Sequence, residues 1–100
     1  MAIQVTVDGD KATFEVEGKI TVQSAPKLED AIDQVPTGVC NFDIDLASVD
    51  YVSSAGLRVF VTVDQLATAR GGTMRLLHPD VAIMQVLEMT GLVDVLTIES

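Results

Sequence analysis

Residues 50–60 read DYVSSAGLRVF, and the rest of the chain is best interpreted from this stretch. A strand-like apolar run ends before Ser53, and an apolar pattern with helical spacing begins after Ser54. Serine is among the commonest residues at helix N-termini, because its hydroxyl accepts a hydrogen bond from an otherwise unpaired backbone N–H. One of the two serines is therefore expected to cap the helix, and the function of the other is open.

Three segments before this stretch alternate between apolar and polar residues, as half-buried β-strands do. They are IQVTV (3–7), ATFEVEG (12–18) and CNFDIDLA (40–47), and the DGDK sequence between the first two is typical of an antiparallel hairpin turn. In the third segment the apolar residues are expected in the core, whereas Asp43 and Asp45 are expected on the solvated side.

Three other segments place apolar residues at the spacing of an amphipathic helix. The first contains LEDAIDQV, with Ser24 as its expected cap. The second runs from Ala55 to Arg70 and is stopped by two glycines. The third covers PDVAIMQVLEMTG, where Asp80 is the expected cap and Gly91 the left-handed residue at the C-terminal end.

Two further strands, TMRLLH (73–78) and VDVLTIE (93–99), complete the series. The order is strand, strand, helix, strand, helix, strand, helix, strand. Helices between strands imply right-handed parallel crossovers after the initial hairpin. We therefore expect one α/β domain over residues 1–100, a mixed β-sheet with an N-terminal hairpin and helices packed on it.

The charge of the chain restricts its partners. Six basic residues against fifteen acidic ones give a net charge of −9, which repels phosphate backbones and anionic membranes. No apolar run approaches the roughly 20 residues needed to span a bilayer, and the N-terminal segment does not resemble a secretion signal. We expect a soluble, cytoplasmic protein that binds neither nucleic acid nor membrane. The charge fits simple solubility or a partner with a basic surface.

The sequence offers little for catalysis. Cys40 and His78 are the only residues of their types, which leaves no internal disulfide, no Cys/His zinc site and no obvious base to activate a serine. Nucleophile-elbow, P-loop and dinucleotide motifs are absent. Asp43 and Asp45 could form a carboxylate pair for acid–base work or a metal, although a solvated strand face explains them as well. We expect no enzyme, catalytic residue, metal or cofactor.

One flank of the second helix is a candidate docking surface. At 100° per residue, Leu57 and Val61 lie beside the inner apolar side, and Ser54 extrapolates to the same flank. A hydroxyl beside a part-exposed apolar pair and Arg58 is typical of a surface that binds a partner. The alternative is that a neighbouring helix covers the two apolar residues.

The segment DIDLASVDYVSSAGLRVF, residues 43–60, resembles the signature of STAS domains, the module of bacterial anti-sigma factor antagonists. The opening hairpin, GKI (18–20), SAPKLEDAI (24–32) and VLEMTGLVDVLTI (86–98) are similar to their family counterparts in order and spacing. The resemblance extends over nearly the whole chain, and the central segment is its most specific part.

This resemblance implies a partner switch. In the family, the unphosphorylated antagonist binds an anti-sigma factor that is also a serine kinase, and so frees the sigma factor. Phosphorylation of one serine breaks the complex, and a serine phosphatase resets it. The family position corresponds to Ser54, with Ser53 as second choice. An alternative within the family is a cytoplasmic subunit of a lipid or anion transport complex, whose serines need not be phosphorylated.

The resemblance and the helix flank together suggest which residues contact the partner. Thr21 is included because family members often carry an acidic residue there. We expect a monomer, with weak dimerisation through the second helix as an alternative. The expected contact residues are Thr21, Ser53, Ala55, Gly56, Leu57, Arg58 and Val61.

Overall fold

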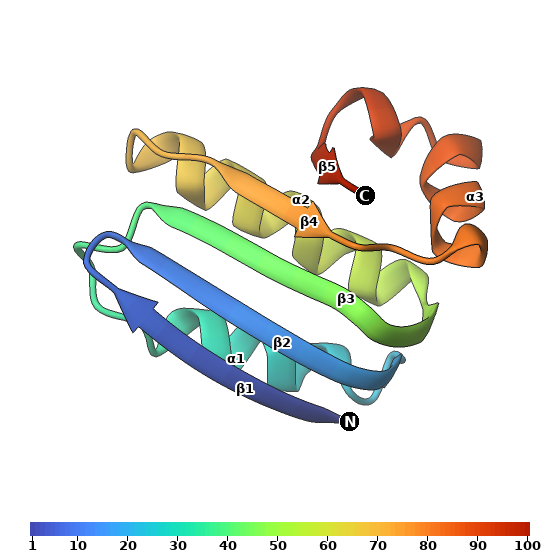
Figure 1. The fold of residues 1–100 in the computed structure, drawn as a ribbon, viewed down its shortest axis with the longest axis horizontal. Helices are drawn as coiled ribbons and strands as arrows, with labels where there is room; N and C mark the ends of the chain where they lie inside the picture. Colours follow the sequence, from blue (N-terminus) through green and yellow to red (C-terminus); the bar gives the residue numbers. More distant parts are fainter.

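The strands of the sheet lie side by side in the order in which they occur in the chain (Figure 1). The computed structural model describes all residues, 1–100. The first two strands are antiparallel, and the later strands follow in parallel, so the predicted order and mixed sheet are confirmed. The elements are β1 (Ala2–Asp8), β2 (Lys11–Ile20), α1 (Ala25–Asp33), β3 (Asn41–Val52), α2 (Ser54–Ala69), β4 (Met74–Leu77), α3 (Val81–Met89), the 3₁₀ helix η1 (Leu92–Asp94) and β5 (Thr97–Glu99).

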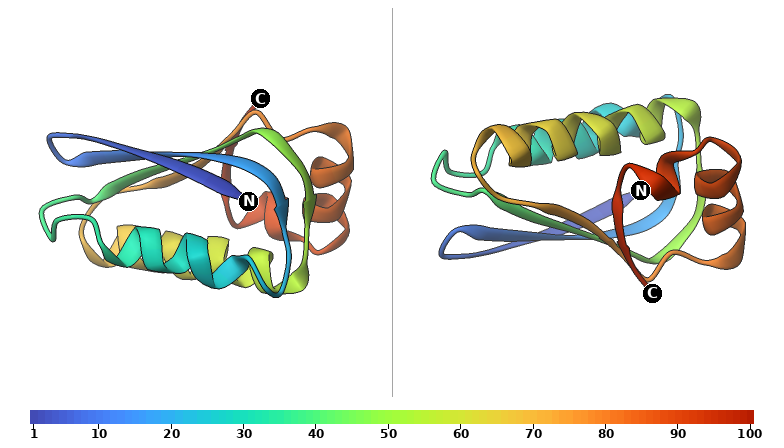
Figure 2. Two further views of the ribbon diagram at one scale, coloured as in Figure 1. Left: turned by 90° about the horizontal axis from the view of Figure 1, so that it is seen from below. Right: turned by 90° about the horizontal axis from the view of Figure 1, so that it is seen from above.

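Helices α1 and α2 cover one face of the sheet, whereas α3 stands at one end of it (Figure 2). Because side chains alternate along a strand, alternate residues of β2, β4 and the first part of β3 point toward the helices. These residues join those of the helices in one core of 23 buried apolar side chains, which includes Phe14, Phe42 and Phe60. No helix covers the opposite, open face of the sheet (Figure 2). None of the helices has the length and apolar character required to cross a bilayer.

Strands β2 and β3 extend beyond their predicted ends, to Ile20 and Val52. The pairing shifts register twice, between Glu15 and Glu17 and between Gly18 and Lys19, and each time β3 contributes an extra residue. A bulge interrupts the two-residue alternation from which a strand is recognised. The additional length was therefore not visible as a simple pattern.

The predicted caps are confirmed at α3 and wrong at α1. Asp80 Oδ1 accepts a hydrogen bond from the N–H of Ile83 at 2.8 Å, and Gly91 has φ +77°. The hydroxyl of Ser24 makes no such bond to α1, because it accepts from the N–H of Thr21 and donates to the carbonyl of Lys19, each at 2.8 Å. The last strand is also shorter than predicted, since residues 92–94 form the 3₁₀ helix.

Asp43 is buried rather than solvated, contrary to the expectation for this side of β3. It points to the open face, but only 3% of the residue is exposed. Lys11 Nζ from β2 lies 2.8 Å from Asp43 Oδ2, and Arg75 from β4 also binds the carboxylate. Burial raises the pKa of Asp43, but hydrogen bonds and charges from Arg75 and Lys11 outweigh burial and hold that pKa below its usual value. Asp45 is half-buried and lies 3.3 Å from His78 Nδ1.

Candidate functional site

The most distinctive surface lies at the C-terminal ends of β2, β3 and β4. We call it the serine edge, because Ser53 and Ser54 follow β3 there. Helices α1, α2 and α3 all begin at this edge, next to α3 in Figures 1 and 2. The first N–H groups of a helix have no partner within the helix and carry partial positive charge. The edge therefore combines loops with helix N-termini that favour negative charge.

The two serines between β3 and α2 differ sharply in environment. Ser53 is 7% exposed, its N–H donates to the carbonyl of Ile20 at 2.8 Å, and its hydroxyl accepts from the N–H of Gly56 at 3.2 Å. Ser54 is exposed and is the first residue of α2. Ser53 is thus the helix cap, which confirms that one serine caps α2, and the hydroxyl of Ser54 is left accessible.

Gly56 brings the start of α2 very close to the sheet. A Cβ atom at this position would lie 2.7 Å from Ile20 Cγ2 and 2.9 Å from Val52 Cγ1, closer than real contacts permit. Gly56 and Ser53 are both buried. The sequence suggested direct partner contact for these two residues, but both are buried, and their packing and hydrogen bond fix the start of α2 at Ser54.

Thr21 lies in the loop that follows β2, beside the start of α2. Its Oγ1 accepts from the N–H of Ser24 at 3.1 Å, and Ser24 Oγ accepts from the N–H of Thr21 at 2.8 Å. Such a reciprocal pair resembles a capping box, in which side chains satisfy two backbone donors. Because Ile20 is hydrogen-bonded to Ser53, the structure brings this loop and Ser54 together.

The outer side of α2 is only partly as predicted. Arg58 is exposed and lies one turn after Ser54, and Ala55 is half-buried. Leu57 packs against the core, and Val61 is also half-buried. The apolar part of the predicted docking flank is therefore smaller than the helical spacing indicated, because the domain itself covers part of both side chains.

Exposed apolar residues at this edge, among them Val22 and Tyr51, were missed by the sequence-based prediction. Val22 is 68% exposed in the loop between β2 and α1, and Tyr51 is 48% exposed near the end of β3. Val22 falls outside every strand and helix pattern, and this could have indicated from the sequence that its side chain is not part of the core. Large apolar side chains on an exposed edge are typical of surfaces that bind other proteins.

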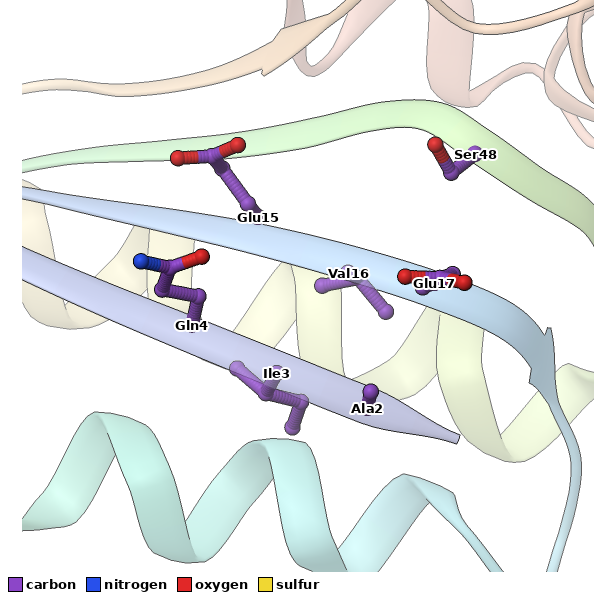
Figure 3. Close-up of a pocket in the computed structure, with 7 residues that line it drawn as sticks. All are labelled: Ala2, Ile3, Gln4, Glu15, Val16, Glu17 and Ser48. Carbon is purple, nitrogen blue, oxygen red and sulfur yellow. The ribbon is translucent and has the colours of Figure 1, made fainter.

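A second candidate site lies on the open face of the sheet. Ala2, Ile3, Gln4, Glu15, Val16, Glu17 and Ser48 line a shallow pocket of about 180 Å³ over β1, β2 and β3 (Figure 3). It holds two carboxylates and no cationic side chain. No group of three or more His, Cys, Asp or Glu in the structure is arranged to hold a metal ion. The serine edge is the stronger candidate.

The chain is similar to known proteins over nearly its whole length. The model of the STAS domain family matches residues 2–100. The anti-sigma-B factor antagonist of Listeria monocytogenes is 33% identical over 93% of this chain and 82% of its own length. The Bacillus subtilis protein of that name is 29% identical over 100% of this chain and 94% of its own length.

Solved structures show the same fold. SpoIIAA, an anti-sigma factor antagonist, superimposes in its unphosphorylated form with a TM-score of 0.82, at 16% identity over 99% of this chain and 89% of that one. Its phosphorylated form gives a TM-score of 0.69, at 19% identity over 99% and 92% of the two chains.

The curated relatives are regulatory proteins, in agreement with the expectation that this chain is not an enzyme. The family match covers almost every residue, and the anti-sigma-B factor antagonists match over nearly the full chain. The chain accordingly belongs to the STAS domain family, among the anti-sigma factor antagonists.

Proposed function

We propose that this protein is a phosphorylation-controlled partner switch in the cytoplasm. In its unphosphorylated form it binds an anti-sigma factor that is also a serine kinase, and the sigma factor is released. Phosphorylation of Ser54 abolishes this binding, and a serine phosphatase restores it. The observation that carries the proposal is the contrast between the accessible Ser54 and the buried, hydrogen-bonded Ser53.

Accessibility favours Ser54 over Ser53 as the phosphate acceptor. A kinase must reach the hydroxyl oxygen from solvent and place it in line with the γ-phosphate of ATP. The hydroxyl of Ser53 faces the backbone of α2, where it satisfies the N–H of Gly56. Phosphorylating Ser53 would require the end of β3 to open, whereas Ser54 needs no rearrangement.

A phosphate on Ser54 would act locally. It adds about −1.5 to −2 charges at neutral pH, at a helix N-terminus that favours anions. The domain should therefore stay folded. Binding is lost because a bulky, strongly hydrated anion stands on the surface that docks the partner. A loss of about 3 kcal/mol in binding free energy lowers affinity more than a hundredfold.

The surroundings of Ser54 supply a docking surface suited to this switch. Thr21, Val22 and Arg58 are at least partly accessible beside or one turn after the serine. We place the partner on this surface and treat the free protein as a monomer. SpoIIAA, which shares the fold, has been solved in an unphosphorylated and a phosphorylated form, and this precedent supports the same chemistry here.

The test is phosphorylation in vitro. The purified chain is incubated with ATP, Mg²⁺ and each serine-kinase anti-sigma factor of the source organism, and the mass of the intact protein and of its peptides is measured. We expect one phosphate on Ser54, absent in Ser54→Ala and retained in the matched control Ser53→Ala. The phosphorylated protein should lose its complex with the kinase in a binding assay.

Two results would overturn the proposal. Phosphate on another residue, with Ser54→Ala still modified, would exclude Ser54 as the switch. No phosphate with any kinase of the organism, together with copurification of the chain with a transport ATPase, would favour the transport-subunit alternative.

A further inference from the structure

Arg58 is an isolated cation near the start of α2. Between Asp50 and Asp64 the chain carries no other charged side chain, although 21% of its residues are charged. Arg58 is also the only basic residue within α2. The first two turns of this helix are therefore locally cationic, on a chain whose net charge is −9.

The guanidinium of Arg58 has no anionic partner within the domain. The other two arginines are both engaged, because Arg70 donates to the carbonyl of Val39 and Arg75 binds the carboxylate of Asp43. Arg58 is exposed and takes part in none of the ion pairs of the structure. Its five N–H donors are therefore available to an anion at the surface.

The helix places Arg58 beside Ser54. The two residues lie four positions apart in α2, and residues at this spacing are neighbours on a helix surface, with Cβ atoms about 5–6 Å apart. Helical side chains also lean toward the N-terminus, so the long side chain of Arg58 extends back over the turn that contains Ser54. The guanidinium can therefore reach a group attached to the Ser54 hydroxyl without a change in the backbone.

We propose that Arg58 binds the phosphate of phosphorylated Ser54. This inference rests on the proposed phosphorylation of that serine. A phosphoserine presents three acceptor oxygens and about −1.5 to −2 charges, and a planar guanidinium binds phosphate through two parallel hydrogen bonds. The pair forms within one exposed turn of α2, so no part of the core has to move.

The pair changes the docking surface in two ways. The phosphate occupies the space next to Ser54, and the cation that the unphosphorylated surface offers to a partner is neutralised. A carboxylate of the partner that contacts Arg58 in the complex then meets a phosphate–arginine pair with a net charge of about −0.5 to −1. Like charges repel, so the two changes act together against binding.

The test uses a chain with phosphoserine at position 54, incorporated during translation by an expanded genetic code, so that it does not depend on a kinase. Phosphorus-31 nuclear magnetic resonance follows the titration of the phosphate, whose second pKa is ordinarily about 6. We expect Arg58→Gln to raise this pKa by about 0.5, because a neighbouring cation favours the doubly charged form. Lys27→Gln removes an exposed cation of α1 and should raise it much less.

Two further measurements distinguish a direct contact from a general effect of charge. The Nε–H signal of Arg58 in nitrogen-15 spectra should shift when Ser54 carries the phosphate. Arg58→Lys keeps the charge but lacks the planar fork, so the pKa of its phosphate should lie between those of the wild type and Arg58→Gln. Circular dichroism verifies that each variant is folded.

An unchanged phosphate pKa in Arg58→Gln would overturn the proposal. An equal rise in Lys27→Gln would also overturn it, since the effect would then come from net charge. Neither result would contradict the release of the partner by phosphorylation. Failure of the proposed function has a different signature, namely no phosphate on Ser54 with any kinase of the organism, and that result would overturn the natural occurrence of this contact as well.

Discussion

Arg75 holds Asp43 through two hydrogen bonds, from Nε to Oδ1 at 2.9 Å and from Nη2 to Oδ2 at 2.7 Å. The pair joins β4 to β3 across the open face, and Lys11 extends it to β2. A buried carboxylate with two cationic neighbours links the stability of the sheet to the ionisation of one side chain.

We predict that Asp43 contributes stability that disappears in acid. Its pKa in the folded protein is lowered, so the contribution is present above the unfolded pKa, about 3.9, and is lost as pH falls through the folded pKa. Asp43→Asn should lower the free energy of unfolding by about 1–3 kcal/mol at pH 7, since the bonds to charged donors are weakened. When the free energy of unfolding is measured by urea denaturation at a series of pH values, it should also fall less steeply toward acid pH for Asp43→Asn than for the wild type.

The exposed pair between Lys19 and Asp50 serves as the control. Asp50 is 65% exposed at its side chain, and such pairs contribute about 1 kcal/mol or less. Asp50→Asn should therefore change stability little. Equal losses for Asp43→Asn and Asp50→Asn would refute a special contribution of the buried carboxylate.

Gly56→Ala should destabilise the domain by about 1–3 kcal/mol, because the added methyl overpacks the contact with Ile20 and Val52. This loss opposes the gain of about 0.5–1 kcal/mol that alanine gives inside a helix. Gly38→Ala is the matched control, since a Cβ there meets no atom within 4 Å. Chemical denaturation of both variants measures the difference, and a Gly56→Ala protein more stable than the wild type would contradict the close approach.

Ser53→Ala should lower the free energy of unfolding by about 1 kcal/mol, the usual cost of losing a helix cap. Ser53→Asp should recover most of it, because aspartate caps helices equally well. Ser54→Ala should have a much smaller effect, since its hydroxyl is not the cap. If Ser54→Ala proved the more damaging of the two alanine substitutions, the assignment of the cap would be wrong.

Ser54→Glu should leave the fold intact and raise its stability by up to about 1 kcal/mol, because a negative charge at a helix N-terminus is favourable. The same charge at the other end of α2, introduced by Ala69→Glu, should lower stability by a similar amount. Thermal unfolding at low salt compares the two variants. Unfolding of Ser54→Glu would show that a negative charge at Ser54 acts by disrupting the domain instead of its surface.

The order of the elements and most of the core could be predicted from the sequence. Alternation in residues 12–18 and helical spacing from Ala55 onward depend only on which side chains face the core, and burial in the structure follows that pattern. The cap at Asp80 and the left-handed Gly91 were predictable for a similar reason, since each depends on neighbouring residues alone.

Features that depend on distant residues could not be predicted in this way. Asp43 is buried because Lys11 and Arg75, 32 residues away from it on either side, lie on the neighbouring strands. The sequence also did not distinguish Ser53 from Ser54 as the cap. That distinction depends on the hydrogen bond from Ser53 to Ile20 and on the bulges that set where β3 ends.

The close approach at Gly56 also bears on the partner binding that we propose at Ser54. With α2 held against Ile20 and Val52, and Ser53 fixed at both its N–H and its hydroxyl, the segment around Ser54 has little conformational freedom to lose. Association then costs less entropy than it would at a mobile loop. A preorganised segment of this kind would lower the entropic cost of the binding that we propose at Ser54.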